Sequence, residues 1–105
     1  MSTEVRARIQ DLVKSNKIML FMKGTKQFPA CGFSNAVVEI LKKEGVSFET
    51  FNILSDPEIR QGLKEYSNWP TYPQLYVDGR FIGGCDIVTE LHQKGELGKE
   101  LTGAA

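Results

Sequence analysis

The run KIMLFMK, residues 17–23, constrains the fold of this chain more than any other stretch. The residues from Ile18 to Met22 are all apolar and show none of the alternation of a strand with one face in water. The run is too short for a helix of its own and stops at Gly24. Such a run is typical of a strand buried on both faces of a sheet. The sequence therefore predicts a sheet covered on both sides by other elements.

The segments around this run alternate between helical and strand patterns. Apolar residues at helical spacing predict four helices, at 3–16, 32–44, 55–68 and 86–97. Alternation predicts a strand over 46–53, and two apolar runs around Asp78-Gly79 predict a hairpin. We expect an α/β fold: a four-stranded mixed β-sheet flanked by helices on both faces. Thr3 is the expected cap of the first helix, and the tail 102–105 is expected to fray.

Composition limits the classes of function. The chain of 105 residues has the size of one domain, with 41% hydrophobic and 25% charged residues as in ordinary globular proteins. Its 13 basic and 13 acidic residues give zero net charge, which argues against nucleic acid or an anionic membrane as partner. We find no apolar run of membrane-spanning length and no apolar core of a signal peptide in MSTEVRARIQ. Two cysteines make no disulfide framework, which favours a reducing compartment.

The stretch FPACGFSNAVV, residues 28–38, places Cys31 where a loop turns into a helix. Unpaired amide hydrogens and the positive end of the helix dipole favour thiolate over thiol at that place, which predicts a nucleophilic Cys31. Lys23, at the end of the preceding strand, is in a position to add positive charge. A redox pair would have its second cysteine where this chain has Ser34. The alternative is a buried, inert cysteine.

Four separated motifs carry a resemblance to a known family. KGT at 23–25, CGFS at 31–34, WPTYPQLYVDG at 69–79 and GGCDI at 83–87 together resemble a monothiol glutaredoxin of the CGFS type. The resemblance implies a thioredoxin-like fold and a single glutaredoxin domain over residues 1–105. It is strongest toward modules of multidomain cytosolic and nuclear proteins, which implies a cytoplasmic and nuclear location. The alternative is the plastid stroma or mitochondrial matrix, where single-domain forms occur.

The same resemblance implies a groove for glutathione beside the thiol. The residues that it places there are Lys23, Arg60, Lys64, Thr71, Tyr72, a cis Pro73, Gly84, Cys85 and Asp86. The residue types suit the ligand, because glutathione has carboxylates that need a cation and an ammonium group that needs a carboxylate. Taken without the resemblance, the default interpretation of Arg60 and Lys64 is a solvated helix face, and Asp86 is equally a helix cap. WPTYP is then equally a loop with two trans prolines.

Two residues of reactive or aromatic type receive no chemical role from the sequence. Trp69 precedes Pro70 in a turn, where packing is the expected function. His92 is the only histidine and lies far along the last predicted helix. We expect it at the surface, without a catalytic part.

A single thiol is compatible with three functions. A [2Fe-2S] cluster generally needs four thiolates, and Cys31 with one bound glutathione supplies two. Two chains supply four, so the first hypothesis is a cluster bridged within a homodimer. The resemblance agrees, because it implies cluster transfer to acceptor proteins, iron homeostasis, BolA-like partners and weak reductase activity. The second hypothesis is a glutathione-dependent oxidoreductase with Cys31 as nucleophile and an open role for Cys85; the third is a docking module with an incidental thiol.

Overall fold

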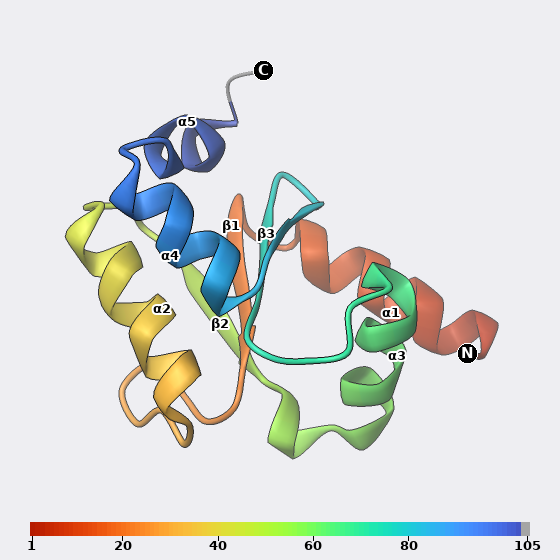
Figure 1. The fold of residues 1–105 in the computed structure, drawn as a ribbon. Helices are drawn as coiled ribbons and strands as arrows, with labels where there is room; N and C mark the ends of the chain where they lie inside the picture. The colour runs from red at the N-terminus through yellow and green to blue at the C-terminus, as the bar shows by residue number, and fades with distance from the viewer. Residues whose placement is uncertain (104–105) are drawn as a thin grey trace.

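The central sheet has four strands in the order β2-β1-β3-β4 (Figure 1). The computed structural model describes residues 1–103. β1 (Ile18–Met22) pairs in parallel with β2 (Glu49–Asn52) and antiparallel with β3 (Gln74–Val77), which continues into antiparallel β4 (Arg80–Gly83). All 5 residues of β1 are buried, which confirms the strand predicted from the continuous apolar run.

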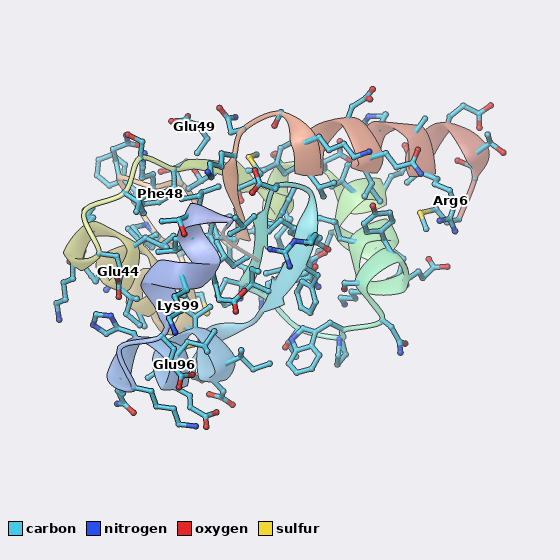
Figure 2. The ribbon with its side chains drawn as sticks, turned by 90° about the horizontal axis from the view of Figure 1, so that it is seen from above. Arg6, Glu44, Phe48, Glu49, Glu96 and Lys99 are labelled. Atoms are coloured by element: carbon cyan, nitrogen blue, oxygen red, sulfur yellow. The ribbon has the colours of Figure 1, made fainter. Side chains whose placement is uncertain are left out.

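Helices cover both faces of this sheet. On one face lie α1 (Thr3–Lys14) and α3 (Pro57–Ser67); on the other lie α2 (Gly32–Lys43), α4 (Cys85–Gln93) and the short α5 (Leu97–Thr102). Side chains of β1 alternate between the two resulting cores, with Leu20 in the one beneath α2 and Phe21 in the one beneath α1. Exposed charged side chains such as Arg6 and Lys99 lie at the periphery (Figure 2). The mixed four-stranded sheet with helices on both faces is therefore confirmed.

The hairpin between β3 and β4 follows from local turn chemistry. Asp78 and Gly79 both have positive φ, 51° and 78°. This is the combination that a tight two-residue hairpin needs. The Asp78 amide donates to the Lys17 carbonyl at 2.8 Å, which fastens the turn to the residue before β1. The predicted hairpin is confirmed.

Several boundaries differ from the sequence prediction. The cap of α1 is Ser2 rather than Thr3, because the Ser2 hydroxyl accepts from the Val5 amide at 3.1 Å. A 3-10 turn, η1 (Ile53–Ser55), follows β2, and α5 follows a break at Gly95. Short elements of this kind carry too little periodicity to be recognised. The predicted fraying of the tail falls partly on residues 104–105, which lie outside the described residues.

Over the described residues, no helix combines the length and the apolar character that crossing a bilayer requires. The ends of one strand and two helices meet at the same end of the sheet. The carboxyl end of β1 and the amino ends of α2 and α4 contribute Lys23, Cys31 and Cys85 to one pocket. In open α/β sheets ligands gather at the carboxyl ends of strands, which makes this pocket the candidate site.

Candidate functional site

Cys31 is the N-cap residue of α2, with extended backbone angles of φ −151° and ψ 137°. The amides of Ser34 and Phe33 face the sulfur and, with the charge of Lys23, lower the pKa of the Cys31 thiol, against a smaller opposing effect of burial. Hydrogen bonds from amides stabilise the charged form of an acidic group more than the neutral form, so these amides favour the Cys31 thiolate. Cys31 is half-exposed, unlike the buried cysteine of the alternative reading.

Ser34, in the place of a second cysteine, has a structural task. Its side chain is 0% exposed, and its hydroxyl accepts from the backbone amide of Lys23 at 3.1 Å. This bond ties the end of β1 to the first turn of α2, on either side of the loop that leads to Cys31. Ser34 therefore fixes where the thiol stands relative to the sheet.

The loop between β1 and Cys31, residues 24–30, has a defined conformation. Gly24 has φ 93°, and a Cβ atom there would lie 2.6 Å from the Phe28 carbonyl oxygen, so only glycine fits. The Lys26 ammonium reaches across to the start of β2, where it donates to the Phe48 carbonyl at 2.6 Å and lies 4.2 Å from the Phe48 ring centre. The loop thereby holds the Phe28 side chain in solvent, 82% exposed.

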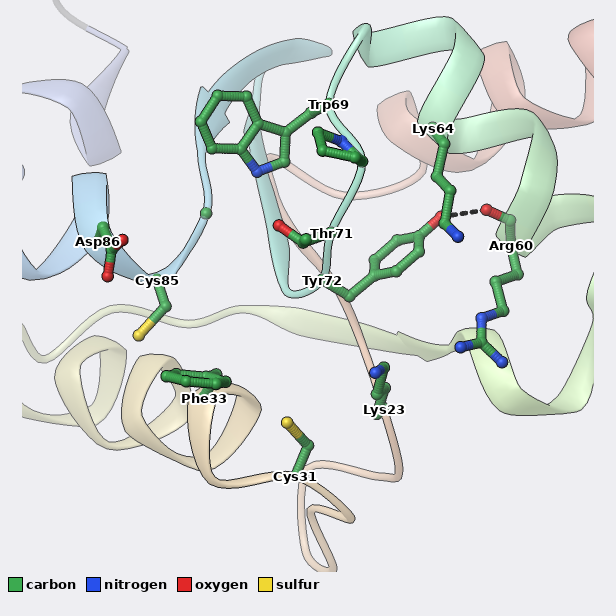
Figure 3. A pocket seen from close by; sticks show the side chains of 12 residues that line it. Lys23, Cys31, Phe33, Arg60, Lys64, Trp69, Thr71, Tyr72, Cys85 and Asp86 are labelled. Carbon is green, nitrogen blue, oxygen red and sulfur yellow. Dashed lines mark hydrogen bonds between the residues drawn. The ribbon is translucent and has the colours of Figure 1, made fainter.

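A pocket of about 330 Å³ opens beside Cys31 (Figure 3). Its size falls within the range of small-molecule sites. Every residue that the sequence analysis assigned to the groove lines it, apart from Pro73, which follows the lining segment directly. The residues that the structure brings together are Lys23, Cys31, Arg60, Lys64, Thr71, Tyr72, Gly84, Cys85 and Asp86, joined by Phe33, Trp69 and Pro70.

The charges of this pocket are separated. Arg60 and Lys64 come from α3 on one side, and Asp86 comes from the amino end of α4 on the other. Cys85 lies beside Asp86, and Cys31 lies lower in the view, between Phe33 and Lys23 (Figure 3). The pocket can therefore bind a ligand with carboxylate groups at one end and a cationic group at the other. Asp86 is not the cap of α4, as the sequence suggested; Gly84 occupies that position, and Asp86 lies in the first turn.

The segment from Trp69 to Pro73 forms the wall opposite Cys31. The Tyr72-Pro73 peptide bond is cis, as the resemblance implied. The Tyr72 hydroxyl donates to the Arg60 carbonyl at 2.6 Å and so connects this wall to α3 (Figure 3). Burial raises the pKa of Tyr72, against a lowering effect of the Arg60 charge, which keeps the hydroxyl a neutral donor.

Sequence reasoning missed the pocket roles of Phe33 and Trp69. The helical pattern of α2 included Phe33 among apolar residues, yet its side chain is 64% exposed beside the thiol. Trp69 packs against Phe81, with ring centres 5.9 Å apart, as expected of a packing residue. It also lines the pocket, where Gly84 lets the chain approach the indole: a Cβ at Gly84 would lie 3.0 Å from Nε1. Their roles could have been predicted from their position, because Phe33 lies in the motif CGFS and Trp69 begins the motif WPTYPQLYVDG.

His92 does not stand free at the surface as predicted. Its Nδ1 lies 2.6 Å from a carboxylate oxygen of Glu44, and the side chain is partly buried. This contact joins the carboxyl end of α4 to the end of α2, far along both helices from the thiol. Within residues 1–103, no three His, Cys, Asp or Glu side chains come together as a metal site. Its contact with Glu44 makes His92 part of the scaffold that joins α2 to α4.

A thiol at the start of a helix, a cis proline facing it and a mixed four-stranded sheet define a protein of the thioredoxin-like class. The family model for glutaredoxin matches residues 18–82. Among curated relatives, the ycf64-like monothiol glutaredoxin of Synechocystis sp. is 63% identical over 92% of this chain and 91% of its own length. The chloroplastic monothiol glutaredoxin S7 of rice is 54% identical over 96% of this chain but only 60% of its own length. The mitochondrial monothiol glutaredoxin 5 of Saccharomyces cerevisiae is 52% identical over 92% of this chain and 67% of its own length.

Solved structures agree with this assignment. Reduced apo GrxS14 of poplar is 54% identical, with a TM-score of 0.83 over 95% of this chain and 92% of that one. The holo form of poplar glutaredoxin C1 is 28% identical, with a TM-score of 0.85 over 97% and 99%. A buckwheat glutaredoxin-glutathione complex is 27% identical, with a TM-score of 0.82 over 98% and 96%. The chain belongs to the glutaredoxin family, and its relatives at high identity are monothiol glutaredoxins.

Proposed function

We propose that this monothiol glutaredoxin binds glutathione beside Cys31 and carries a [2Fe-2S] cluster, shared between two copies, for transfer to acceptor proteins. The observation that supports this most is the arrangement at the pocket: one activated, half-exposed thiol faces a groove with cations at one end and a carboxylate at the other. Ser34 stands where a resolving cysteine would be and is buried in a structural hydrogen bond. The thiol therefore lacks a partner in its own motif.

Glutathione fits the groove by chemistry. Its glycine carboxylate is complementary to Arg60, Lys64 or Lys23, and the ammonium of its γ-glutamyl end is complementary to Asp86. Its peptide backbone needs an extended partner, which the segment Thr71–Tyr72 offers. The related buckwheat protein forms a glutaredoxin-glutathione complex on the same fold. In this arrangement the glutathione sulfur comes beside Cys31.

The cluster is proposed as cargo rather than as a permanent part of the protein. The chain has two cysteines in all, and a [2Fe-2S] cluster generally needs four thiolates. Two copies, each giving Cys31 and one glutathione, complete the set, and exchangeable ligands favour release to an acceptor. The exposed Phe28 and Phe33, both within three residues of Cys31 in the chain, suit a face that meets another molecule. A related glutaredoxin with 28% identity is described in a holo form.

The second candidate function is a glutathione-dependent oxidoreductase. The lowered pKa of Cys31 supports it, because the thiolate is the nucleophile in disulfide exchange. In that reaction the Cys31 thiolate attacks the glutathione sulfur of a mixed disulfide and expels the substrate thiolate. A second glutathione thiolate then attacks the Cys31-glutathione disulfide, which regenerates the Cys31 thiolate and releases oxidised glutathione. Both functions use the same groove.

Acceptor proteins and BolA-like proteins are proposed partners on the basis of the family resemblance. For the location, the names of the relatives favour the alternative over the cytoplasmic and nuclear expectation. They include chloroplastic and mitochondrial proteins and a cyanobacterial one. We therefore propose a plastid stroma, a mitochondrial matrix or a bacterial cell as the setting.

The deciding experiment is anaerobic reconstitution with iron, sulfide and glutathione, followed by visible absorption and mass measurement. We expect visible bands and a dimer mass that require glutathione, loss of both in Cys31→Ser, and retention of most of the cluster in the matched control Cys85→Ser. A colourless monomer with measurable reductase turnover would support the oxidoreductase instead. A Cys31→Ser protein that assembled the same cluster would disprove the assigned ligand.

A further inference from the structure

Gln74 is a fully buried amide, 0% exposed, at the first position of β3 and directly after the cis proline. Its Nε2 donates to two carbonyls of the pocket wall, that of Trp69 at 3.2 Å and that of Thr71 at 3.3 Å. Its Oε1 accepts from the Tyr76 hydroxyl at 3.1 Å. Gln74 does not line the pocket itself.

This set of bonds allows the amide one orientation. An amide group buried without partners is costly, so Gln74 is held wherever its donors and acceptor are satisfied together. If the amide were flipped, Oε1 would face the two carbonyl oxygens, which are also acceptors, and Nε2 would face the Tyr76 hydroxyl, which acts as the donor in the present orientation. The flipped amide would therefore lose its hydrogen bonds. The carbonyls of Trp69 and Thr71 are therefore held toward the interior by a rigid group.

The orientation of one carbonyl determines that of the next amide. The carbonyl of Thr71 and the N–H of Tyr72 belong to one trans peptide plane, in which they point in opposite directions. Because Gln74 holds the Thr71 carbonyl inward, the Tyr72 N–H points away from the interior. Thr71 and Tyr72 line the pocket, and no hydrogen bond among residues 1–103 uses this N–H. The hydrogen bond from the Tyr72 hydroxyl to the Arg60 carbonyl holds the same segment from its other side.

We propose that Gln74 is a positioning residue for ligand binding: its amide, anchored by Tyr76, aims the Tyr72 N–H at the backbone of glutathione. The inference rests on the proposed function, because it takes glutathione as the ligand of this pocket. Gln74 acts through the wall and touches no ligand. A pocket with the same charges but an unanchored wall would keep its contacts to the two ends of glutathione and lose the one in the middle.

The test compares Gln74→Met, which keeps the length of the side chain but has no amide, with Gln61→Met, an exposed glutamine on α3. Glutathione affinity is measured by calorimetry, and the proton shift of the Tyr72 amide by NMR during the titration. In the wild-type chain we expect the Tyr72 amide signal to move downfield as glutathione binds. Gln74→Met should bind about three- to tenfold more weakly, without this shift, and Gln61→Met should behave as wild type.

Tyr76→Phe gives a second, milder route to the same question if Gln74→Met folds poorly. It removes only the hydroxyl that anchors Gln74, and Tyr66→Phe is the matched control on the same side of the sheet. We expect a smaller loss of affinity and a weaker Tyr72 shift in Tyr76→Phe alone. Wild-type affinity and a wild-type Tyr72 shift in both Gln74→Met and Tyr76→Phe would overturn the inference.

Arg60→Ala separates this inference from the proposed function and from simple collapse of the pocket. If wild-type chain binds no glutathione, the proposed function fails, and the inference fails with it. If the wild-type chain binds glutathione and Arg60→Ala weakens that binding, the proposed function is supported. The Gln74 variants then test the positioning role by itself. In the Gln74→Met background Arg60→Ala should still cause its full fold-loss. Disappearance of that effect would mean that the pocket has collapsed, which contradicts a positioning role.

Discussion

At the scale of single residues, the two thiols of this chain share a pocket but not an environment. Cys31 caps α2 and faces amides in that helix's first turn, whereas Cys85 is the first residue of α4 and lies 3.9 Å from the Thr89 hydroxyl. The pKa of the Cys31 thiol is lowered, and the two largest causes, the amides of Ser34 and Phe33, are local. The N-cap position, whose side chain faces the free amides of the first turn, therefore activates Cys31.

The reactivity of Cys31 should show this pKa shift. In a Cys85→Ser background, we expect the alkylation rate to reach half its maximum at a lower pH in the folded chain than in the same chain unfolded in urea. Because the folded-state pKa is the lower one, the thiolate stabilises the fold as pH rises through that value, and this contribution is lost as pH falls again. Coinciding midpoints in the folded and unfolded chains would contradict the shift.

Ser34 should matter to the stability of the fold. Ser34→Ala removes the acceptor of the half-buried Lys23 amide, and we expect the free energy of unfolding in urea to fall by about 1 to 3 kcal/mol. The control is Ser15→Ala, an exposed hydroxyl on the Leu12 carbonyl, expected to change it by less than about 0.5 kcal/mol. If the two substitutions lowered the free energy of unfolding equally, the Ser34 hydrogen bond would contribute no more to stability than an exposed one.

At the scale of elements, two long-range contacts hold the loop of residues 24–30 against β2. Lys26 connects the loop to Phe48, and it also lies 3.7 Å from the Glu49 carboxylate. The Gly24 amide donates to the Asn52 side chain at 3.0 Å, at the other end of β2. The loop is thus fastened to both ends of the edge strand, which keeps Cys31 at a fixed place.

Removing the Lys26 contact should loosen the loop without unfolding the chain. We expect Lys26→Met to speed hydrogen exchange of the Ala30 amide, which donates to the Lys23 carbonyl, by about tenfold. Exchange in β1 should not change. Lys42→Met, which removes an exposed ion pair with Glu39, is the matched control. Unchanged exchange at Ala30 would show that Gly24 and Asn52 hold the loop alone.

At the scale of the whole molecule, the sheet separates two cores, and close packing on one side positions α3 with its two cations. A Cβ at Gly62 of α3 would lie 2.8 Å from the Ile9 Cδ1 and 2.9 Å from the Val5 Cγ1 of α1. Gly62 therefore sets how near the two helices lie. Since α3 carries Arg60 and Lys64, this contact also sets the position of one pocket wall.

Gly62→Ala should push α1 and α3 apart. We expect it to lower the free energy of unfolding by about 1 to 3 kcal/mol, as overpacking of a filled core does. Gly98→Ala in α5 is the control, because its nearest contact would be an ordinary 3.8 Å to Glu44, and better helix propensity should make it neutral or stabilising by up to about 1 kcal/mol. A Gly62→Ala chain as stable as wild type would show that the interface has room.

Most of the fold was predictable because its signals are local. The apolar run of β1, the helical spacing of α2 and the Asp78-Gly79 turn each follow from neighbouring residues. The elements that the sequence did not predict are short, such as η1 and α5. For the site, the helix start identified Cys31 from the residues alone, whereas the pocket roles of Arg60 and Asp86 came from family resemblance. Composition leaves those two residues equally suited to a solvated surface.

The sequence by itself determined the layered α/β fold and the single activated thiol, since periodicity and helix capping act over a few neighbouring residues. Only the tertiary structure decided that Ser34 holds the end of β1, that Lys26 fastens its loop to Phe48 and that Gln74 holds two carbonyls of the pocket wall. Each of the first two bonds joins separate segments of the chain. The third depends on which way a buried amide turns. Contacts of this kind follow from how the elements pack, which no local pattern specifies.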